Sequence, residues 1–215
     1  MNSSWQDYIT VIFELNELGC NINNKMISEK LDISPPSVTE MIKKLKSEGL
    51  VDGRKSNLFL TEKGVLEAKK IMSKHRLWEY FLKNELGYDW GEVHEEAKAL
   101  QYSTSDKLMN RLNKYLKEPI ACPHGGYIFI NSNDDYDKKL ISLSNVDEGN
   151  RVMIERLADI KDLLEYMDRK KLSLGDFIYV EKIDKYDGSI LIRKEDKLEV
   201  QIGIIAAKDI FVSEI

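Results

Sequence analysis

This sequence has few cysteines, no long apolar run and no excess of positive charge. Its 215 residues include two cysteines, Cys20 and Cys122, which stand far apart in the chain. That spacing indicates neither a disulfide framework nor a paired-cysteine metal motif, and it favours a reducing compartment. No apolar run approaches the roughly 20 residues of a membrane helix, and the first residues do not resemble a signal peptide. We therefore expect a soluble, cytoplasmic protein.

The charge balance excludes a surface that binds nucleic acid everywhere. The formal net charge is −5, so any contact with DNA must come from a local basic patch. The segment 43–63 is such a patch, because six cations outnumber three acidic residues there: Lys43, Lys44, Lys46, Arg54, Lys55 and Lys63 against Glu48, Asp52 and Glu62.

Motifs of catalysis are also missing. The segment His94–Lys98 resembles the start of a zinc-protease helix, but Lys98 stands where the second histidine is needed. The sequence has no glycine-rich phosphate loop and no G-x-S-x-G nucleophile elbow. An enzyme is therefore not expected.

The first 64 residues have the pattern of a winged helix-turn-helix. Apolar periodicity predicts helices over 5–18, ending at Gly19, and over 24–31. A third helix begins with Ser34 as its N-cap and Pro35 in its first turn, and runs to about Gly49. Short strands at 50–54 and 58–61 around a polar turn then form the wing.

The remainder changes from helical to strand-rich patterning. Helices are predicted from Thr61 or Glu62 through Met72, then over 74–85, 91–101 and 104–117, before Pro119 and the Cys122–Gly126 segment break helicity. The polar stretch 131–139 is typical of a linker. Beyond it, strands near 152–154, 177–180, 189–192 and 198–202, with one helix over 160–167, indicate a small bent antiparallel barrel.

The third helix is the predicted DNA-reading element. Its N-terminal turns, which point into the major groove in this fold, carry Ser34, Pro36, Ser37, Thr39 and Glu40. Hydroxyls can reach bases or phosphates, and the prolines offer an apolar edge to a thymine methyl group. Phosphate contacts, which give affinity and register rather than specificity, are expected from the basic residues Lys25, Lys43, Arg54 and Lys55. The competing interpretation is a capped surface helix without a ligand.

In this order, the segments resemble the diphtheria-toxin-repressor family of metal-dependent regulators, particularly the longer manganese and iron regulators with a C-terminal SH3-like, or FeoA-like, domain. The residues that carry the resemblance are Asp7–Ile9, Ser34–Thr39 with Leu45–Val51, Leu60–Gly64, Lys74–Leu77 with Glu79, Val93–Ala97, Cys122–Gly125 and a final strand over Ile204–Val212.

The resemblance implies an α+β multidomain protein. Its predicted parts are a winged helix-turn-helix over 1–64, an all-α dimerisation and metal-binding domain with its linker over 65–140, and an SH3-like β-barrel over 141–215. It also implies contact of Pro36 with DNA.

The three histidines fall at or beside positions where the family places metal ligands. His75 and Glu79 are four residues apart and share a helix face, and His94 lies on the next helix, so these three side chains can converge. The resemblance implies that they form the ancillary site, completed by Asp162 or Asp159 of the third domain. Histidines in ordinary polar packing are the alternative.

The family's other site departs from the pattern. Asp7 is retained, but Lys98, Gln101 and Tyr102 stand where the resemblance implies ligands, and Thr10 also replaces a possible one. A lysine is protonated at neutral pH and binds metal poorly. Two interpretations stay open. Asp7, Cys122, His124 and Gln101 form a partial site, or the Lys98 ammonium pairs with Asp7 and replaces the ion.

The function expected from the sequence is a metal-responsive, homodimeric transcriptional regulator that binds a palindromic DNA operator and represses genes of metal uptake or homeostasis. Its cofactor is a divalent ion, Mn²⁺ or Fe²⁺, or none. The alternatives are a metal-independent regulator of the same fold and an interaction adaptor that does not bind DNA. An adaptor would show no salt-dependent DNA affinity.

Overall fold

The structure is a computed structural model that describes residues 4–17, 21–54, 56–132, 140–158 and 160–214. It divides into two compact units, residues 1–74 and 75–215, and each is described by itself. The predicted C-cap Gly19, the wing residue Lys55, the linker residues 133–139 and the candidate ligand Asp159 lie outside the described residues.

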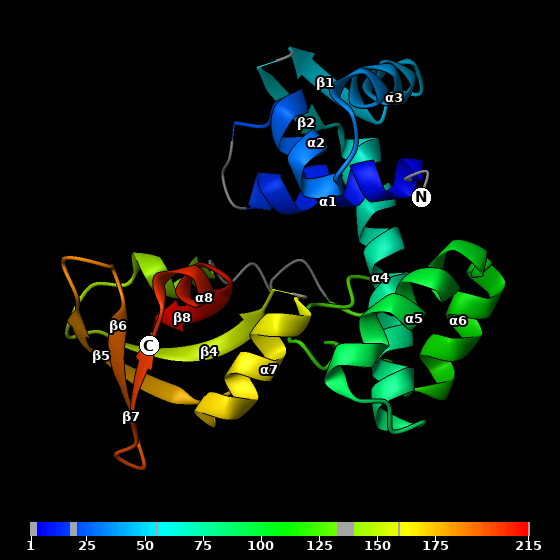
Figure 1. Cartoon of the computed structure of the whole chain (residues 1–215). Helices are drawn as coiled ribbons and strands as arrows, with labels where there is room; N and C mark the ends of the chain where they lie inside the picture. The colour runs from blue at the N-terminus through cyan, green and yellow to red at the C-terminus, as the bar shows by residue number, and fades with distance from the viewer. Residues whose placement is uncertain (1–3, 18–20, 55, 133–139, 159, 215) are drawn as a thin grey trace. The chain divides into compact units, whose positions relative to one another are not determined.

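The first unit begins with three helices and a two-stranded wing (Figure 1). The elements are α1 (Trp5–Glu17), α2 (Asn24–Leu31), α3 (Pro35–Ser47), β1 (Val51–Arg54) and β2 (Asn57–Leu60). Val51 pairs with Leu60 and Arg54 with Asn57 in an antiparallel hairpin. Apolar residues on one face of each helix and on the wing make the core of this unit. Among the most deeply buried are Ile9, Ile12, Ile22, Ile27, Val38, Leu45 and Leu58.

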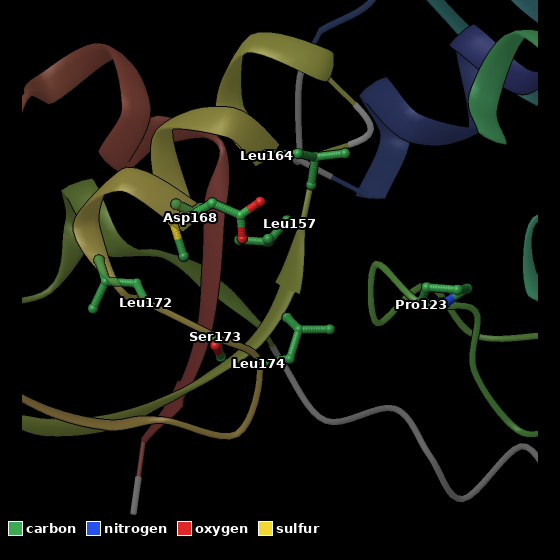
Figure 2. A pocket seen from close by; sticks show the side chains of 8 residues that line it. Pro123, Leu157, Leu164, Asp168, Leu172, Ser173 and Leu174 are labelled. Atoms are coloured by element: carbon green, nitrogen blue, oxygen red, sulfur yellow. The ribbon is translucent and has the colours of Figure 1, made fainter. Parts of the chain in front are cut away.

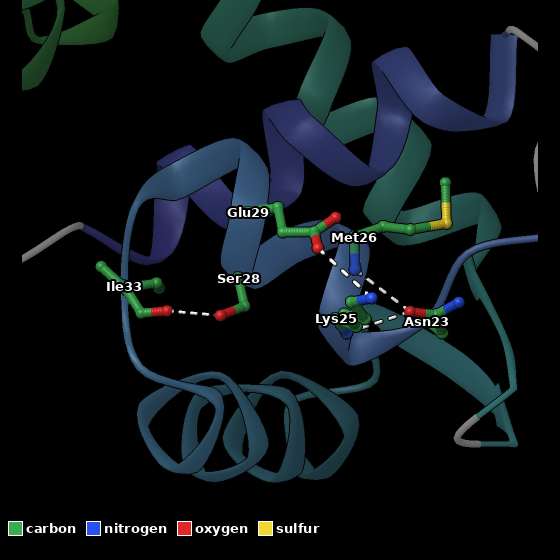
Figure 3. A network of polar contacts seen from close by, with 6 residues as sticks. All are labelled: Asn23, Lys25, Met26, Ser28, Glu29 and Ile33. Carbon is green, nitrogen blue, oxygen red and sulfur yellow. Dashed lines mark hydrogen bonds and ion pairs between the residues drawn. The ribbon is translucent and has the colours of Figure 1, made fainter.

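Side-chain caps set where α2 and α3 begin. The Asn23 side chain accepts hydrogen bonds from the Lys25 and Met26 backbone N–H groups (Figure 3). The α2 helix ends at Asp32, whose φ of 52° is left-handed, and the Ser28 hydroxyl donates to the Ile33 carbonyl. Ser34 caps α3 and prolines occupy its first positions, as expected. The result is two short helices joined by a tight turn.

The wing needs a glycine at its bend. Gly53 has a φ of 101°, and a Cβ there would lie 2.1 Å from the Asn57 carbonyl oxygen. The Lys46 ammonium group donates to the Gly53 carbonyl, so the side of α3 holds the hairpin. The wing is therefore attached to the helix that it follows.

A single long helix, α4 (Glu62–Asn84), replaces the two shorter helices that the sequence predicts on either side of residue 73. The prediction was wrong because Ser73 does not break the helix: its hydroxyl donates to the Lys69 carbonyl one turn back, and the residue is fully buried. Two further helices follow, α5 (Trp90–Ser103) and α6 (Asp106–Tyr115), and Leu77 of α4 packs with Met109 and Leu112 of α6.

The C-terminal part is a six-stranded antiparallel sheet in the order β3-β8-β4-β5-β6-β7. Its elements are β3 (Ile141–Ser142), the 3₁₀ helix η2 (Leu143–Asn145), β4 (Arg151–Leu157), α7 (Lys161–Lys170), β5 (Phe177–Ile183), β6 (Ile190–Lys194), β7 (Glu199–Ile202), α8 (Ile204–Lys208) and β8 (Ile210–Glu214). Leu164 and Met167 of α7 and Ala207 of α8 share one core with the sheet. The pairing of the described residues leaves β3 and β7 as edges, so this SH3-like sheet is open.

The last expected strand, over 204–212, is in fact a short helix followed by β8. Ala206 and Ala207 favour a helix, and Ala207 is fully buried in the core of the sheet. Across the described residues, no helix has both the length and the apolar character that a membrane crossing needs.

Candidate metal centre and nucleic-acid interface

Glu79 is the centre of a cluster of metal-ligand side chains in the second unit. It lies on α4 one turn after His75, and its side chain is 1 % exposed. The Nε2 atom of His75 is 3.0 Å from the Glu79 Oε1 atom. The expected i, i+4 pair on one helix face is thus formed inside the protein rather than at its surface.

His94 reaches the same carboxylate from α5. Its Nδ1 atom is 3.8 Å from Glu79 Oε1, and its ring packs edge-on against the His75 ring with centroids 4.9 Å apart. His94 keeps 35 % of its side-chain surface exposed, so it is the member of the cluster nearest to solvent. The predicted convergence of His75, Glu79 and His94 is present.

Cys122 and His124 approach Glu79 from a tight turn. Gly125 N–H donates to the Cys122 carbonyl and Cys122 N–H to the Gly126 carbonyl, which folds the chain back on itself. Nδ1 of His124 is 3.3 Å from Glu79 Oε1, and both Cys122 and His124 are buried. The sequence grouped these two residues with Asp7 and Gln101, whereas the structure places them against Glu79.

The ligand atoms form two overlapping groups, His75–Glu79–His94 and Glu79–Cys122–His124. Within each group the donor atoms all lie within 4.8 Å of one another. Glu79 belongs to both. The two sets that the sequence treats as separate therefore share one buried carboxylate.

The charges of this centre are strongly coupled. Burial by itself would raise the pKa of Glu79, but the His75 charge and hydrogen bonds from the three histidines hold that pKa well below its usual value. Burial, helped by the negative charge of Glu79, raises the pKa of the Cys122 thiol well above its usual value, while Arg76 opposes the rise. Glu79 is thus ionised, and Cys122 is protonated in the metal-free protein at neutral pH.

These residues fit a transition-metal ion. A buried carboxylate costs free energy unless positive charge or hydrogen bonds compensate it, and here imidazoles face it from three directions. Imidazole suits first-row transition metals, carboxylate suits Mn²⁺ among others, and thiolate selects softer ions. The mixed nitrogen, oxygen and sulfur set therefore suits a divalent first-row ion better than Ca²⁺ or Mg²⁺, which prefer oxygen ligands.

Other predicted ligands stand apart from these groups. Asp162 is exposed in the first turn of α7 and belongs to neither group among the described residues. Asp7 lies in the first unit, where its carboxylate accepts a hydrogen bond from the Ser4 N–H at 2.8 Å. Its role as a metal ligand stays a prediction. Of the two residues on α5 at positions where the resemblance implies ligands, Gln101 is buried, at 7 % exposure, and Tyr102 is exposed, at 40 %.

The predicted DNA-reading face of α3 is open to solvent. The exposed residues there are Ser34, Pro36, Ser37, Glu40 and Lys43, and Arg54 is exposed on the wing. Ser34 and Ser37 hydroxyls are 2.9 Å apart. Lys25, on α2, lies 3.6 Å from Glu29 in an exposed ion pair that phosphate contacts can replace (Figure 3). A set of hydroxyls and cations is therefore available to a ligand.

Thr39 differs from its neighbours on α3. Its hydroxyl donates to the Pro35 carbonyl and accepts a hydrogen bond from the Asn24 side-chain amide, at 3.0 Å each. These bonds join α3 to α2. Thr39 thus holds the two helices of the motif together, a role that the sequence reasoning did not assign to it.

Arg76 is a second residue whose role the sequence reasoning missed. It follows His75 directly, yet it is 9 % exposed and its guanidinium donates to the Tyr127 carbonyl. The signal in the sequence is weak, since an arginine on a helix ordinarily points to solvent. Only the fold shows that it faces the Cys122–Gly126 turn.

The chain matches three protein-family descriptions in sequence order. Residues 1–57 match the N-terminal DNA-binding domain of iron-dependent repressors, and residues 61–130 match their metal-binding and dimerisation domain. Residues 141–214 match the FeoA domain. The predicted domain boundaries, at 64 and 140, stay predictions.

Individual relatives are similar to this chain over different lengths. The iron-dependent repressor IdeR of Mycobacterium tuberculosis is 37% identical over 123 residues, which are 56% of this chain and 53% of the relative. The match thus spans about half the length of that relative. IdeR of Mycobacterium leprae is 31% identical over 176 residues, which are 76% of each chain.

A solved structure is similar over nearly the whole chain. It is a manganese-dependent transcriptional repressor in complex with manganese, 32% identical, with a TM-score of 0.89 over 99% of this chain and 100% of that one. The expected family and fold class are confirmed by these matches.

Proposed function

The chain belongs to the iron-dependent repressor family, and we propose that it is a metal-responsive, sequence-specific transcriptional repressor that acts in the cytoplasm as a homodimer. The proposal makes the winged helix-turn-helix the DNA-binding part and the Glu79 cluster the metal centre. It draws support from the family descriptions, which name DNA binding, metal binding and dimerisation for consecutive parts of this chain.

The observation that carries the proposal is the continuity of α4. This helix begins at Glu62, directly after the wing strand β2 and Thr61, and continues without a break through His75 and Glu79. We propose that a change in how the metal centre holds α4 is passed along this helix to the DNA-binding part.

Within the metal centre, we assign the ligands to Glu79, His75, His94, Cys122 and His124. A bound divalent ion would supply positive charge at Glu79. The ionised Glu79 carboxylate is already in place to accept it, His75 and His94 bring α4 and α5 to it, and Cys122 gives up its thiol proton to ligate. Because Glu79 serves both ligand groups, occupation joins α4, α5 and the Cys122–Gly126 turn.

The identity of the native ion is part of the proposal. The solved relative in complex with manganese and the relatives named iron-dependent repressors point to Mn²⁺ or Fe²⁺. We further propose that the Asp7 region binds no ion tightly, because Lys98, Gln101 and Tyr102 replace the ligands that the resemblance implies. A protonated lysine repels a cation.

Dimerisation is proposed through the helical region. It exposes large apolar side chains, including Leu86 at 55 %, Leu108 at 44 % and Tyr115 at 65 % exposure. Such residues are costly to leave in water and mark interaction surfaces when they cluster. A twofold dimer would place two α3 helices on a palindromic operator.

The experiment is DNA binding to the operator region upstream of the protein's own gene, measured by fluorescence anisotropy with Mn²⁺, with Fe²⁺ under anaerobic conditions, and with a chelator. Metal-dependent binding of the parent that is lost in Glu79→Gln supports the proposal. Glu95→Gln is the matched control, because Glu95 is an exposed carboxylate outside both ligand groups.

Two other outcomes correspond to the alternatives. Equal binding with and without chelator would favour the metal-independent regulator in which Lys98 and Asp7 replace the ion. No salt-dependent binding to any DNA would favour the interaction adaptor, because phosphate contacts always release counterions.

A further inference from the structure

The turn that carries Cys122 and His124 is held between two surfaces, and a different glycine faces each one. Gly126 faces α4 of the helical region, and Gly125 faces β4 of the C-terminal sheet. Adjacent glycines are thus required for different reasons on the two sides of the turn.

On the helical side, Arg76 lies against the turn. A Cβ at Gly126 would come within 2.7 Å of Arg76 Nε and 3.2 Å of Cys122 Sγ. The Arg76 guanidinium also donates to the Tyr127 carbonyl and stacks 4.9 Å from the Phe129 ring centroid. This buried side chain therefore contacts the backbone that follows both candidate ligands.

On the sheet side, the contact is made by backbone atoms of β4. The Leu157 N–H donates to the His124 carbonyl at 3.0 Å. Gly125 has a φ of 79°, and a Cβ on it would lie 2.1 Å from the Glu155 carbonyl oxygen and 3.0 Å from Arg156 Cα. A residue with any side chain cannot fit there without moving the turn away from β4.

A cavity lies beside the turn on this side. This cavity, of about 240 Å³, separates Pro123 from Leu157, Leu164 and Leu174 of the C-terminal part. Figure 2 shows Pro123 on its own loop, across from Leu164 of α7 and Leu157 of β4. Next to this cavity, the His124–Leu157 hydrogen bond and the close approach of Gly125 to Glu155 are backbone contacts between the turn and β4.

We propose that β4 of the C-terminal domain positions the metal-binding turn through this backbone latch, defined as the His124–Leu157 hydrogen bond with the Gly125–Glu155 contact. The proposal rests on the proposed function of the Glu79–Cys122–His124 group as a metal site. The C-terminal domain then tunes metal affinity through these backbone contacts, and Arg76 is the positioning residue on the opposite side of the turn.

The physical reason is preorganisation. Cys122 and His124 are separated by one residue, so a shift of their shared turn moves both donor atoms relative to Glu79. Metal affinity depends on ligand geometry, and losing a group that orients ligands typically lowers it about 10- to 100-fold. A latch made of backbone atoms holds the turn before any ion arrives.

The test compares Gly125→Ala with Gly149→Ala in the full-length chain. Gly149 has a similar positive φ of 87°, but a Cβ there would meet nothing within 4 Å. Both variants place an alanine at a similar positive φ, and only the first disturbs the latch. Co²⁺ is titrated and followed by its thiolate charge-transfer absorption, and amide exchange at Leu157 is measured in the metal-free protein.

The expected result is that Gly125→Ala loses about 10-fold or more in Co²⁺ affinity, with faster exchange at the Leu157 amide, while Gly149→Ala stays within about twofold of the parent. Equal Co²⁺ affinity of the parent and Gly125→Ala would overturn the latch. If the parent itself bound neither Co²⁺ nor Mn²⁺, the proposed function would fail, and unprotected Leu157 exchange in that same parent would overturn the latch separately.

A second variant covers the case in which Gly125→Ala does not fold. Arg76→Gln removes the guanidinium contacts without any backbone strain. It should weaken the thiolate absorption band while leaving the helical circular dichroism unchanged. A full-strength band in folded Arg76→Gln would show that the turn needs no support from α4, and this would remove Arg76 from the proposal.

Discussion

The two candidate ligand-binding regions of this protein use polar side chains in opposite ways. On α3, Ser37 and Lys43 are exposed to solvent. Around Glu79, a carboxylate, a thiol and an imidazole are buried against one another. Exposed groups interact strongly only when a ligand excludes water, whereas buried groups are coupled to the fold itself. Changes at the two regions should therefore differ in kind.

The largest effect is expected at Glu79. Glu79→Gln should abolish metal uptake altogether, because this carboxylate belongs to both ligand groups. By contrast, the double variant His75→Ala, His94→Ala should still bind one ion at the Glu79–Cys122–His124 group, with lower affinity than the parent. Calorimetric titration with Mn²⁺ measures both variants. Full uptake by Glu79→Gln would show that the ions bind elsewhere and that the buried cluster is only structural.

Lys98→Glu asks whether the Asp7 region can be converted into a metal site like the one around Glu79. It restores a carboxylate where the resemblance implies a ligand, so a second Mn²⁺ per subunit should bind. The control is Lys107→Glu, which makes the same charge change at an exposed residue of α6. Two strong sites in the unmodified protein would contradict the view that the Asp7 region is degenerate.

The buried thiol predicts a pH dependence. The pKa of Cys122 is raised, so the thiol is protonated in the metal-free protein and must lose its proton to ligate. Affinity should therefore fall as pH decreases, by about tenfold per pH unit for this one proton, throughout the range below the raised pKa. Calorimetry in two buffers of different ionisation enthalpy should count about one more released proton for the parent than for Cys122→Ser. Equal proton release would mean that Cys122 is not a ligand.

At the exposed region, Ser37→Ala should reduce binding to the operator by about 1 to 3 kcal/mol with little effect on nonspecific DNA. The metal-free protein should keep its thermal stability, because Ser37 is exposed. Anisotropy with operator and scrambled DNA makes the comparison. An equal loss on both DNAs would place Ser37 on the phosphate backbone.

Lys43→Ala should have the smallest and least specific effect. It should weaken binding to every DNA alike and reduce the salt slope by about one unit, since one phosphate contact releases about one counterion. A change in operator preference instead would mean that α3 lies differently in the groove from the arrangement proposed here.

Much of the fold could be predicted because local rules act within short segments. The Asn23 and Ser34 caps, the prolines at the start of α3 and the alternating strands follow from a few residues each. The exceptions depend on burial, which short segments do not show. Ser73 is buried inside α4 and donates to the Lys69 carbonyl, and Ala207 lies on a short helix that packs into the core of the sheet.

The sequence by itself determined which side chains can ligate a metal or contact DNA, because spacing on a helix places His75 near Glu79 and exposes Ser37 beside Ser34. Only the tertiary structure decided that Cys122 and His124 meet Glu79, and that Arg76 and β4 hold their turn. Those contacts join residues distant in the chain, and they depend on how α4, the turn and the C-terminal sheet pack. No periodicity in a short segment records that packing.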